Sequence, residues 1–324
     1  MRARAITIGA LLLASLVWWV PARSAEPDWP DAITIATASP GGTYYAYGEG
    51  LAKILARVLG IRVAMRPTEG PTENIELIEA GEAQVGFVTM GVAQQGWNGT
   101  GDWTSGKQYR AMRAMFPMYD TPFHVIVLQA SGIQSVADLA GKRLGVGPQG
   151  GTSATYTPRL LATLQLEAPL SYGTWADLTA QMQQGALDGL AVAAGVPFPA
   201  VAELEAKNKV RYVPLTPEQI LKLRLAIPEL NASVIPAGTY PSLMYGYETV
   251  GLYNFAVARQ DLPASLVYEI VRAVFDHHEE MMAAHPAAAS TVPKNFVHNT
   301  FLPYHDGAIR YYGNAVAPGV VLGD

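Results

Sequence analysis

The sequence has 324 residues, no cysteine and a formal net charge of −5, and 50% of its residues are hydrophobic against 15% charged. The lack of cysteine excludes disulfides and thiolate metal sites, and the negative charge argues against nucleic acid or an anionic membrane surface as a partner. A chain of this length can build a stable core without disulfides, and it more often forms two domains than one.

The first 25 residues have the pattern of an export signal. Arg2 and Arg4 precede an apolar run at 5–20, and small residues follow at 21–25. The run is too short for an ordinary membrane-spanning helix, so we predict a signal peptide over residues 1–25 that is cleaved on export to the periplasm. An uncleaved anchor is the alternative. Removing three arginines lowers Lys+Arg from 22 to 19 against 27 Asp+Glu, which gives a net charge of −8.

The first folded unit is predicted to be a strand, a glycine turn and a helix. Residues 33–37 are short and β-branched, and apolar residues then recur at helical spacing until Gly60, which is placed to cap the helix. Gly42, Thr43 and Tyr44 lie at the turn. The unpaired N–H groups of a first helical turn and the helix dipole attract an anion such as a carboxylate. A plain strand-to-helix turn with Thr43 as the N-cap is the alternative.

The same pattern recurs 109 positions after Gly42. Residues 143–164 are again predicted to be a strand, a glycine turn and a helix, with Gly151, Thr152 and Ser153 at the turn. Two half-chains of similar build predict two α/β lobes. Ligands of open α/β sheets lie beyond the carboxyl ends of the strands, where both turns fall. The sequence therefore predicts a ligand cleft between the lobes, with a carboxylate held by both glycine turns.

Further candidates for the cleft follow in chain order. Asn74 opens a predicted helix, and Thr89 ends an apolar strand. Tyr119 and His124 lie near the predicted crossing between the lobes, where they can donate or accept hydrogen bonds. A structural role is the alternative for a single histidine at a strand edge. Gly195 follows the last strand of the second glycine unit.

Two segments are predicted to cross between the lobes, at 125–129 and at 247–259. The expected division is therefore 26–125 for the first part of lobe 1, 126–246 for lobe 2 and 247–324 for the second part of lobe 1. Closure by hinge motion at the crossing strands is the expected movement.

No catalytic or cofactor motif in the sequence is convincing. The motif G-x-G-x-x-G begins at Gly145, but this glycine lies inside the predicted strand and Pro148 stiffens the turn, so we expect no dinucleotide. His277 and His278 are adjacent, diverge by about 100° on a helix and cannot share one metal ion. We expect no metal, no cofactor and no catalysis. An extracytoplasmic enzyme with dispersed catalytic residues is the alternative.

Three segments resemble the TAXI-type extracytoplasmic solute receptors that serve TRAP transporters. They read TASPGGTYY at 37–45, GPQGGT at 147–152 and IPAGTY at 235–240, and the resemblance extends over nearly all of the mature chain. It implies a two-lobed α/β periplasmic binding fold of the type II kind. It also implies a small organic acid or an amino acid as the ligand, and TRAP membrane permease subunits as partners.

Two departures from the family pattern bear on the ligand. Thr89-Met90-Gly91 replaces a more polar triplet, and Ser153-Ala154 lacks the acid that the family often has there. An ammonium group binds best beside a carboxylate, so these changes favour an organic acid, a monocarboxylate or a dicarboxylate, without an amine. We expect a monomeric receptor for such an acid. An amino acid such as glutamate is the alternative ligand, and a receptor that feeds a membrane signalling sensor is the alternative function.

Overall fold

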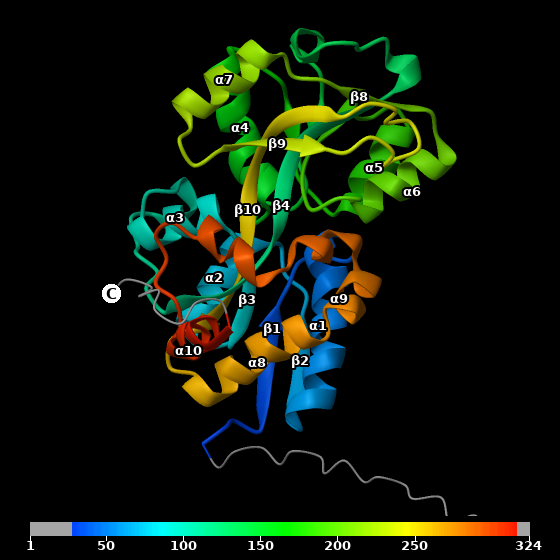
Figure 1. Cartoon of the computed structure of the whole chain (residues 1–324). Helices are drawn as coiled ribbons and strands as arrows, with labels where there is room; N and C mark the ends of the chain where they lie inside the picture. Colours follow the sequence, from blue (N-terminus) through cyan, green and yellow to red (C-terminus); the bar gives the residue numbers. More distant parts are fainter. Residues whose placement is uncertain (1–27, 316–324) are drawn as a thin grey trace, which may run out of the picture.

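Two lobes joined by two long strands make up the computed structural model (Figure 1), which describes residues 28–315. The joining strands are β4 (Met112–Leu128) and β10 (Tyr247–Arg259), which pair antiparallel with each other. Strand β10 has the bounds predicted for the second crossing segment. The predicted signal peptide lies outside the described residues.

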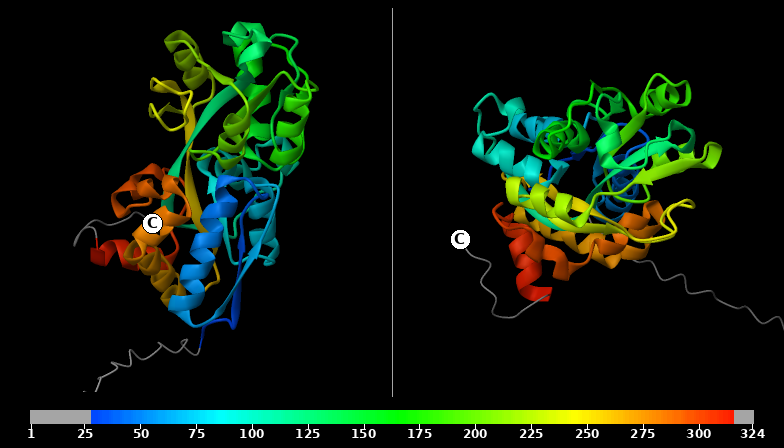
Figure 2. Two further views of the ribbon diagram at one scale, coloured as in Figure 1. Left: turned by 90° about the vertical axis from the view of Figure 1, so that its right-hand side faces the viewer. Right: turned by 90° about the horizontal axis from the view of Figure 1, so that it is seen from above.

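Lobe 1 is a mostly parallel sheet with helices on both faces. Its strands follow the order β2-β1-β3-β10-β4, and β1 is parallel to both β2 and β3. The C-terminal helices pack against this lobe (Figure 2). The elements are β1 (Ala32–Ala36), β2 (Arg62–Arg66), β3 (Val85–Thr89), α1 (Thr43–Leu59), α2 (Pro71–Ala80), α3 (Met90–Asn98), α8 (Ala264–Asp276), α9 (His278–Ala284) and α10 (Asp306–Ala315).

Lobe 2 is built on the second halves of the joining strands. Strand β4 pairs antiparallel with β7 and β8, β7 is parallel to β5, and β9 pairs with β10. The elements are β5 (Leu144–Gly145), β6 (Leu170–Ser171), β7 (Gly189–Ala193), β8 (Val210–Val213), β9 (Asn231–Ile235), α4 (Thr152–Leu164), α5 (Trp175–Gln183), α6 (Pro199–Lys207) and α7 (Pro217–Ala226).

Helix α1 confirms the predicted apolar face. Tyr47, Leu51 and Leu55 are all fully buried in the core of lobe 1, one helical turn apart. Gly60 ends the helix in the left-handed conformation with φ 67°, which a residue with a side chain adopts only at some strain. Among residues 28–315, no helix has both the length and the apolar character needed to cross a membrane.

Candidate functional site

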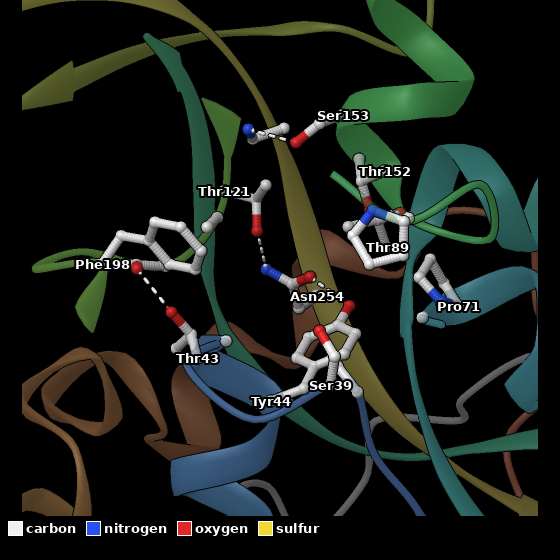
Figure 3. Close-up of a pocket in the computed structure, with 18 of the residues that line it drawn as sticks. Ser39, Thr43, Tyr44, Pro71, Thr89, Thr121, Thr152, Ser153, Phe198 and Asn254 are labelled. Carbon is white, nitrogen blue, oxygen red and sulfur yellow. Dashed lines mark hydrogen bonds between the residues drawn. The ribbon is translucent and has the colours of Figure 1, made fainter. Parts of the chain in front are cut away.

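A cavity lies between the two lobes, beside the joining strands. It is small, with about 60 Å³ accessible to the centre of a water molecule. Figure 3 shows side chains from both lobes facing it, with Ser39, Thr43 and Tyr44 on the side of lobe 1 and Thr152 and Ser153 on helix α4 of lobe 2. The site is therefore shared by the lobes and depends on their closure.

Helices α1 and α4 begin at this cavity from opposite lobes. The N-cap residues are Gly42 and Gly151, both in extended conformation, so Thr43 is the first helical residue and not the N-cap. Neither helix has a side-chain cap or an acidic residue in its first turn. In neither helix does a side chain of that helix occupy the first-turn N–H groups. These N–H groups and the helix dipoles favour an anion at the start of each helix.

Direct hydrogen bonds join the lobes around the cavity. Thr43 Oγ1 donates to the carbonyl oxygen of Gly195 at 2.7 Å, and the hydroxyl oxygens of Thr89 and Thr152 are 3.1 Å apart. Thr43 and Thr89 belong to lobe 1, whereas Gly195 and Thr152 belong to lobe 2. These contacts describe a closed conformation, in which residues predicted to hold the ligand also hold the lobes together.

Asn254 on β10 ties helix α1 to the joining strands. Its side chain is fully buried, and its Oδ1 accepts a hydrogen bond from the Tyr44 hydroxyl at 2.6 Å. Its Nδ2 donates to the carbonyl oxygen of Tyr119 at 2.6 Å and to the Thr121 hydroxyl. Asn254 and Thr121 both line the cavity, and neither was predicted. A polar residue inside the otherwise apolar stretch 250–258 was the available signal.

Tyr119 leaves a hydroxyl group without a partner at the cavity. The residue is 2% exposed, and its hydroxyl has no hydrogen-bond partner within the described part of the chain. Burial raises the pKa of this hydroxyl well above its usual value, so it stays protonated and can donate. A buried polar group without a partner is unfavourable, so a ligand atom that accepts this hydrogen bond is stabilised.

The electrostatics of the cavity come from the backbone and from one acid. Glu69 is the only charged side chain among the described residues that line it. Its Oε2 accepts a hydrogen bond from the backbone N–H of Gly150 at 3.1 Å, across the cleft. The sequence had indicated a less acidic cavity, because the acid that the family often has after Ser153 is missing. Glu69 supplies an acid from another loop, which precedes helix α2 and whose direction the sequence does not reveal.

Nine of the ten predicted site residues line the cavity. They are Gly42, Thr43, Tyr44, Thr89, Tyr119, Gly151, Thr152, Ser153 and Gly195. The aromatic residues Trp175 and Phe198 line it as well and were not predicted, because the helix and loop that carry them gave no sign of facing the cleft.

His124 does not line the interlobe cavity. It is three positions from Thr121 on β4, and an odd separation along a strand places side chains on opposite faces. Its ring is buried in lobe 2 near Tyr212 and Tyr240, and its Nδ1 lies 3.1 Å from the carbonyl oxygen of Pro122. This position does not fit the predicted contact with a ligand in the interlobe cleft.

Asn74 is also absent from the residues that line the cavity. Its Nδ2 donates to the carbonyl oxygens of Thr37 and Phe87, both at 2.8 Å. Its Oδ1 accepts from the Thr68 hydroxyl at 2.7 Å. The side chain therefore joins helix α2 to the residue after β1 and to the middle of β3, and its bond with Thr68 positions the loop that carries Glu69.

The pH dependence of stability is expected to contain a contribution from His124. Burial lowers its pKa from 6.5 to about 4. Because the folded pKa lies below the unfolded value, the neutral ring stabilises the fold above the unfolded pKa, and this contribution is lost as the pH falls toward the folded pKa. We expect a loss of about 2 kcal/mol between about pH 7 and about pH 5. Urea unfolding of the protein and of His124→Phe at both pH values measures it.

The comparison with His124→Phe is needed because Asp120 titrates in the same range. Burial raises the pKa of Asp120 to about 6, so its contribution to stability increases as the pH falls, with the opposite sign. Only the difference between the two proteins isolates His124. The same pH slope in both would show that the ring is not held neutral by the fold.

Comparison with known proteins agrees with this architecture. A model of a family described as the NMT1-like family matches residues 35–315. A solved structure of a periplasmic transporter is 13% identical, with a TM-score of 0.55, over 78% of this chain and 85% of that chain. The periplasmic binding protein BugD is 14% identical, with a TM-score of 0.53, over 81% and 86%.

A third similar structure is of a protein bound to L-arginine. It is 14% identical, with a TM-score of 0.50, over 84% of this chain and 95% of that chain. At such identities the likeness concerns the fold alone. It confirms the predicted fold class: a two-lobed α/β protein of the kind found among periplasmic binding proteins.

Proposed function

This chain belongs to the NMT1-like family, and we propose that it is a periplasmic receptor that captures a small carboxylate between its lobes and delivers it to a TRAP-type, ion-coupled permease. The observation that carries the proposal is the meeting of two helix N-termini, without side-chain caps or first-turn acids, at one interlobe cavity. Such N-termini bind carboxylates through backbone N–H groups.

The proposed ligand is a small organic acid held from both sides. The N–H groups after Gly42 bind one carboxylate, and those after Gly151 bind the same group or a second one. The unpartnered hydroxyl of Tyr119 donates a further hydrogen bond. A dicarboxylate can bind the N-termini of both helices at once. Its binding therefore stabilises the closed conformation more than the binding of a ligand that contacts one helix.

An amino acid is the second candidate ligand, and Glu69 is the observation that favours it. Its carboxylate lines the cavity and is available to pair with an ammonium group. Glu69 is itself exposed, so this pairing is weaker than that of a buried carboxylate. The organic acid therefore stays the first candidate.

We propose a binding role rather than a catalytic one. Among the residues described at the cavity, Glu69 is the single charged side chain, and one carboxylate supplies neither a nucleophile with its base nor an acid–base pair. In this proposal the closed conformation is what the permease recognises. Uptake of the solute by vesicles that contain the permease distinguishes the transporter class, because a TRAP system requires an ion gradient and an ATP-driven system requires ATP.

Thermal unfolding with a panel of organic acids and amino acids tests the ligand class. A true ligand at 100 times its Kd is expected to stabilise the protein by about 2.7 kcal/mol. In a protein of this size, each kcal/mol of stabilisation raises Tm by about 2–4 °C or less. We therefore expect a total rise of a few degrees. Thr43→Val and Thr152→Val are expected to reduce the shift, because both hydroxyls join the lobes.

Thr179→Val is the matched control for this panel. The Thr179 hydroxyl bonds within helix α5 to the carbonyl oxygen of Ala176, and Thr179 does not line the cavity. The Tm shift is expected to survive in this variant. A shift with amino acids alone would replace the organic acid by the second candidate, and no shift with any compound would contradict the proposed receptor and favour an enzyme or a signalling receptor.

A further inference from the structure

A second cavity lies inside lobe 2, between helix α4 and strands β4 and β7. About 50 Å³ of it is accessible to the centre of a water molecule, and it shares no lining residue with the interlobe cavity. Its wall is mainly aliphatic, with buried residues such as Leu144, Leu161 and Val192. This cavity therefore has a different chemistry from the cleft, and the proposed receptor function does not use it.

Two polar atoms on this apolar wall have no hydrogen-bond partner among residues 28–315. They are His124 Nε2 and Thr157 Oγ1, on residues that are 1% and 4% exposed. Buried polar atoms are almost always paired, because a buried atom without a partner has lost the hydrogen bonds that it makes to water in the unfolded chain. Two such atoms at one cavity indicate that their partner is a molecule held inside it.

The hydrogen bonds available to this molecule follow from the other contacts of His124. The carbonyl oxygen of Pro122 can only accept, so His124 Nδ1, at 3.1 Å from it, carries the ring proton. Nε2 then presents a lone pair to the cavity, while the Thr157 hydroxyl can donate. No Asp, Glu, Lys or Arg lines this cavity in the described part of the chain, so a charged ligand is disfavoured.

We propose that this cavity binds a small, uncharged aliphatic molecule with one hydroxyl group, that is, a short-chain alcohol. The ligand hydroxyl donates to His124 Nε2 and accepts from Thr157 Oγ1, and its carbon atoms pack against the leucine and valine side chains. A cavity of about 10–15 Å³ is enough to hold a single water molecule, so this cavity has room for more than one water. The remaining apolar volume suits carbon better than water.

Titration with 2-propanol, followed by the ¹⁵N NMR resonance of His124 Nε2, tests the proposal. The purified protein is used, and the resonance is assigned by its loss in His124→Phe. We expect a saturable upfield shift, because a hydrogen bond to Nε2 changes the shielding of this nitrogen. Thr157→Val keeps the side-chain shape and removes the hydroxyl, so the affinity for the alcohol is expected to fall about fivefold.

Two further variants make the result specific. Thr157→Ser retains the hydroxyl and is expected to bind the alcohol within about twofold of the parent protein, since the hydrogen bond is kept. Thr179→Val, on helix α5, is expected to change nothing. A shift that grows linearly without saturation, or equal affinity in the parent and Thr157→Val, would mean that the cavity holds water only and would overturn the proposal. Solute binding in the cleft is measured separately, so it can succeed or fail independently.

Discussion

Gly195→Ala is expected to weaken solute binding by about 100-fold or more, equivalent to about 2.7 kcal/mol, without changing the fold of either lobe. A Cβ atom at Gly195 would lie 2.4 Å from Cε2 of Tyr119 and 2.9 Å from Cγ2 of Thr43. Gly195 belongs to lobe 2, whereas the other two side chains belong to lobe 1 and the joining strand. The added methyl group therefore prevents the lobes from closing to the separation described here.

The loss of affinity follows from the loss of closure. A cleft held open loses the hydrogen bond from Thr43 to Gly195 and brings only one of the two helix N-termini to the ligand. The backbone of Gly195 is not in the left-handed region, so alanine causes no local strain. Opening of the hinge relieves the steric overlap, and the unliganded protein is expected to remain folded.

Isothermal titration with a ligand from the unfolding panel measures the affinity, and small-angle scattering reports whether the lobes close. Gly246→Ala is the control in lobe 2, because the nearest atom to its added Cβ lies at an ordinary 3.6 Å. Unchanged affinity in Gly195→Ala would contradict the proposal that the described closed conformation is the one that holds the solute.

The parts of the site that the sequence revealed are those encoded locally. A glycine turn followed by a helix is recognisable in a single segment, and it occurs twice, at Gly42 and Gly151. A strand bounded by turn residues is equally local, which is why β10 was predicted with its observed bounds. Because ligands gather at the carboxyl ends of strands, these local features placed most of the predicted residues at one cavity.

The parts that the sequence did not reveal depend on pairing between distant strands. The pairing of β4 with β10 decides which face of β4 lies toward the cleft. The register of this pair shifts between Tyr253 and Phe255 of β10. His124 was therefore assigned to the wrong face, while Thr121 and Asn254 were missed. Glu69 was missed for a related reason, since the neighbouring Thr68 is hydrogen-bonded to the buried side chain of Asn74.

Asn254→Asp is expected to lower the free energy of unfolding by about 3–5 kcal/mol at neutral pH, the range found when a buried charge loses compensation. The change keeps the shape of the side chain and the acceptor for the Tyr44 hydroxyl. It replaces the Nδ2 donor by an oxygen that faces the carbonyl oxygen of Tyr119. Two acceptors then face each other in a fully buried position, and the repulsion acts on the strands that form the hinge.

The pH dependence of Asn254→Asp identifies this cause. Burial raises the pKa of the new carboxyl above its unfolded value, so its protonated form is favoured by folding and can donate to Tyr119. The penalty is therefore present above the folded pKa, and it is relieved as the pH falls toward the unfolded pKa. Urea unfolding over this range measures the difference between variant and parent, which removes most of the effect of Asp120 because that residue titrates in both.

Asn98→Asp is the control for this change. Asn98 is exposed at the end of helix α3, where the same substitution is expected to cost less than about 1 kcal/mol and to show little of this pH dependence. A loss as small as this in Asn254→Asp would show that the buried network does not hold helix α1 to the joining strands. A large loss that acid does not relieve would point to altered packing rather than to the pair of facing acceptors. The expected result, a large and acid-relieved loss, would establish that one asparagine couples the carboxylate-facing helix to the hinge.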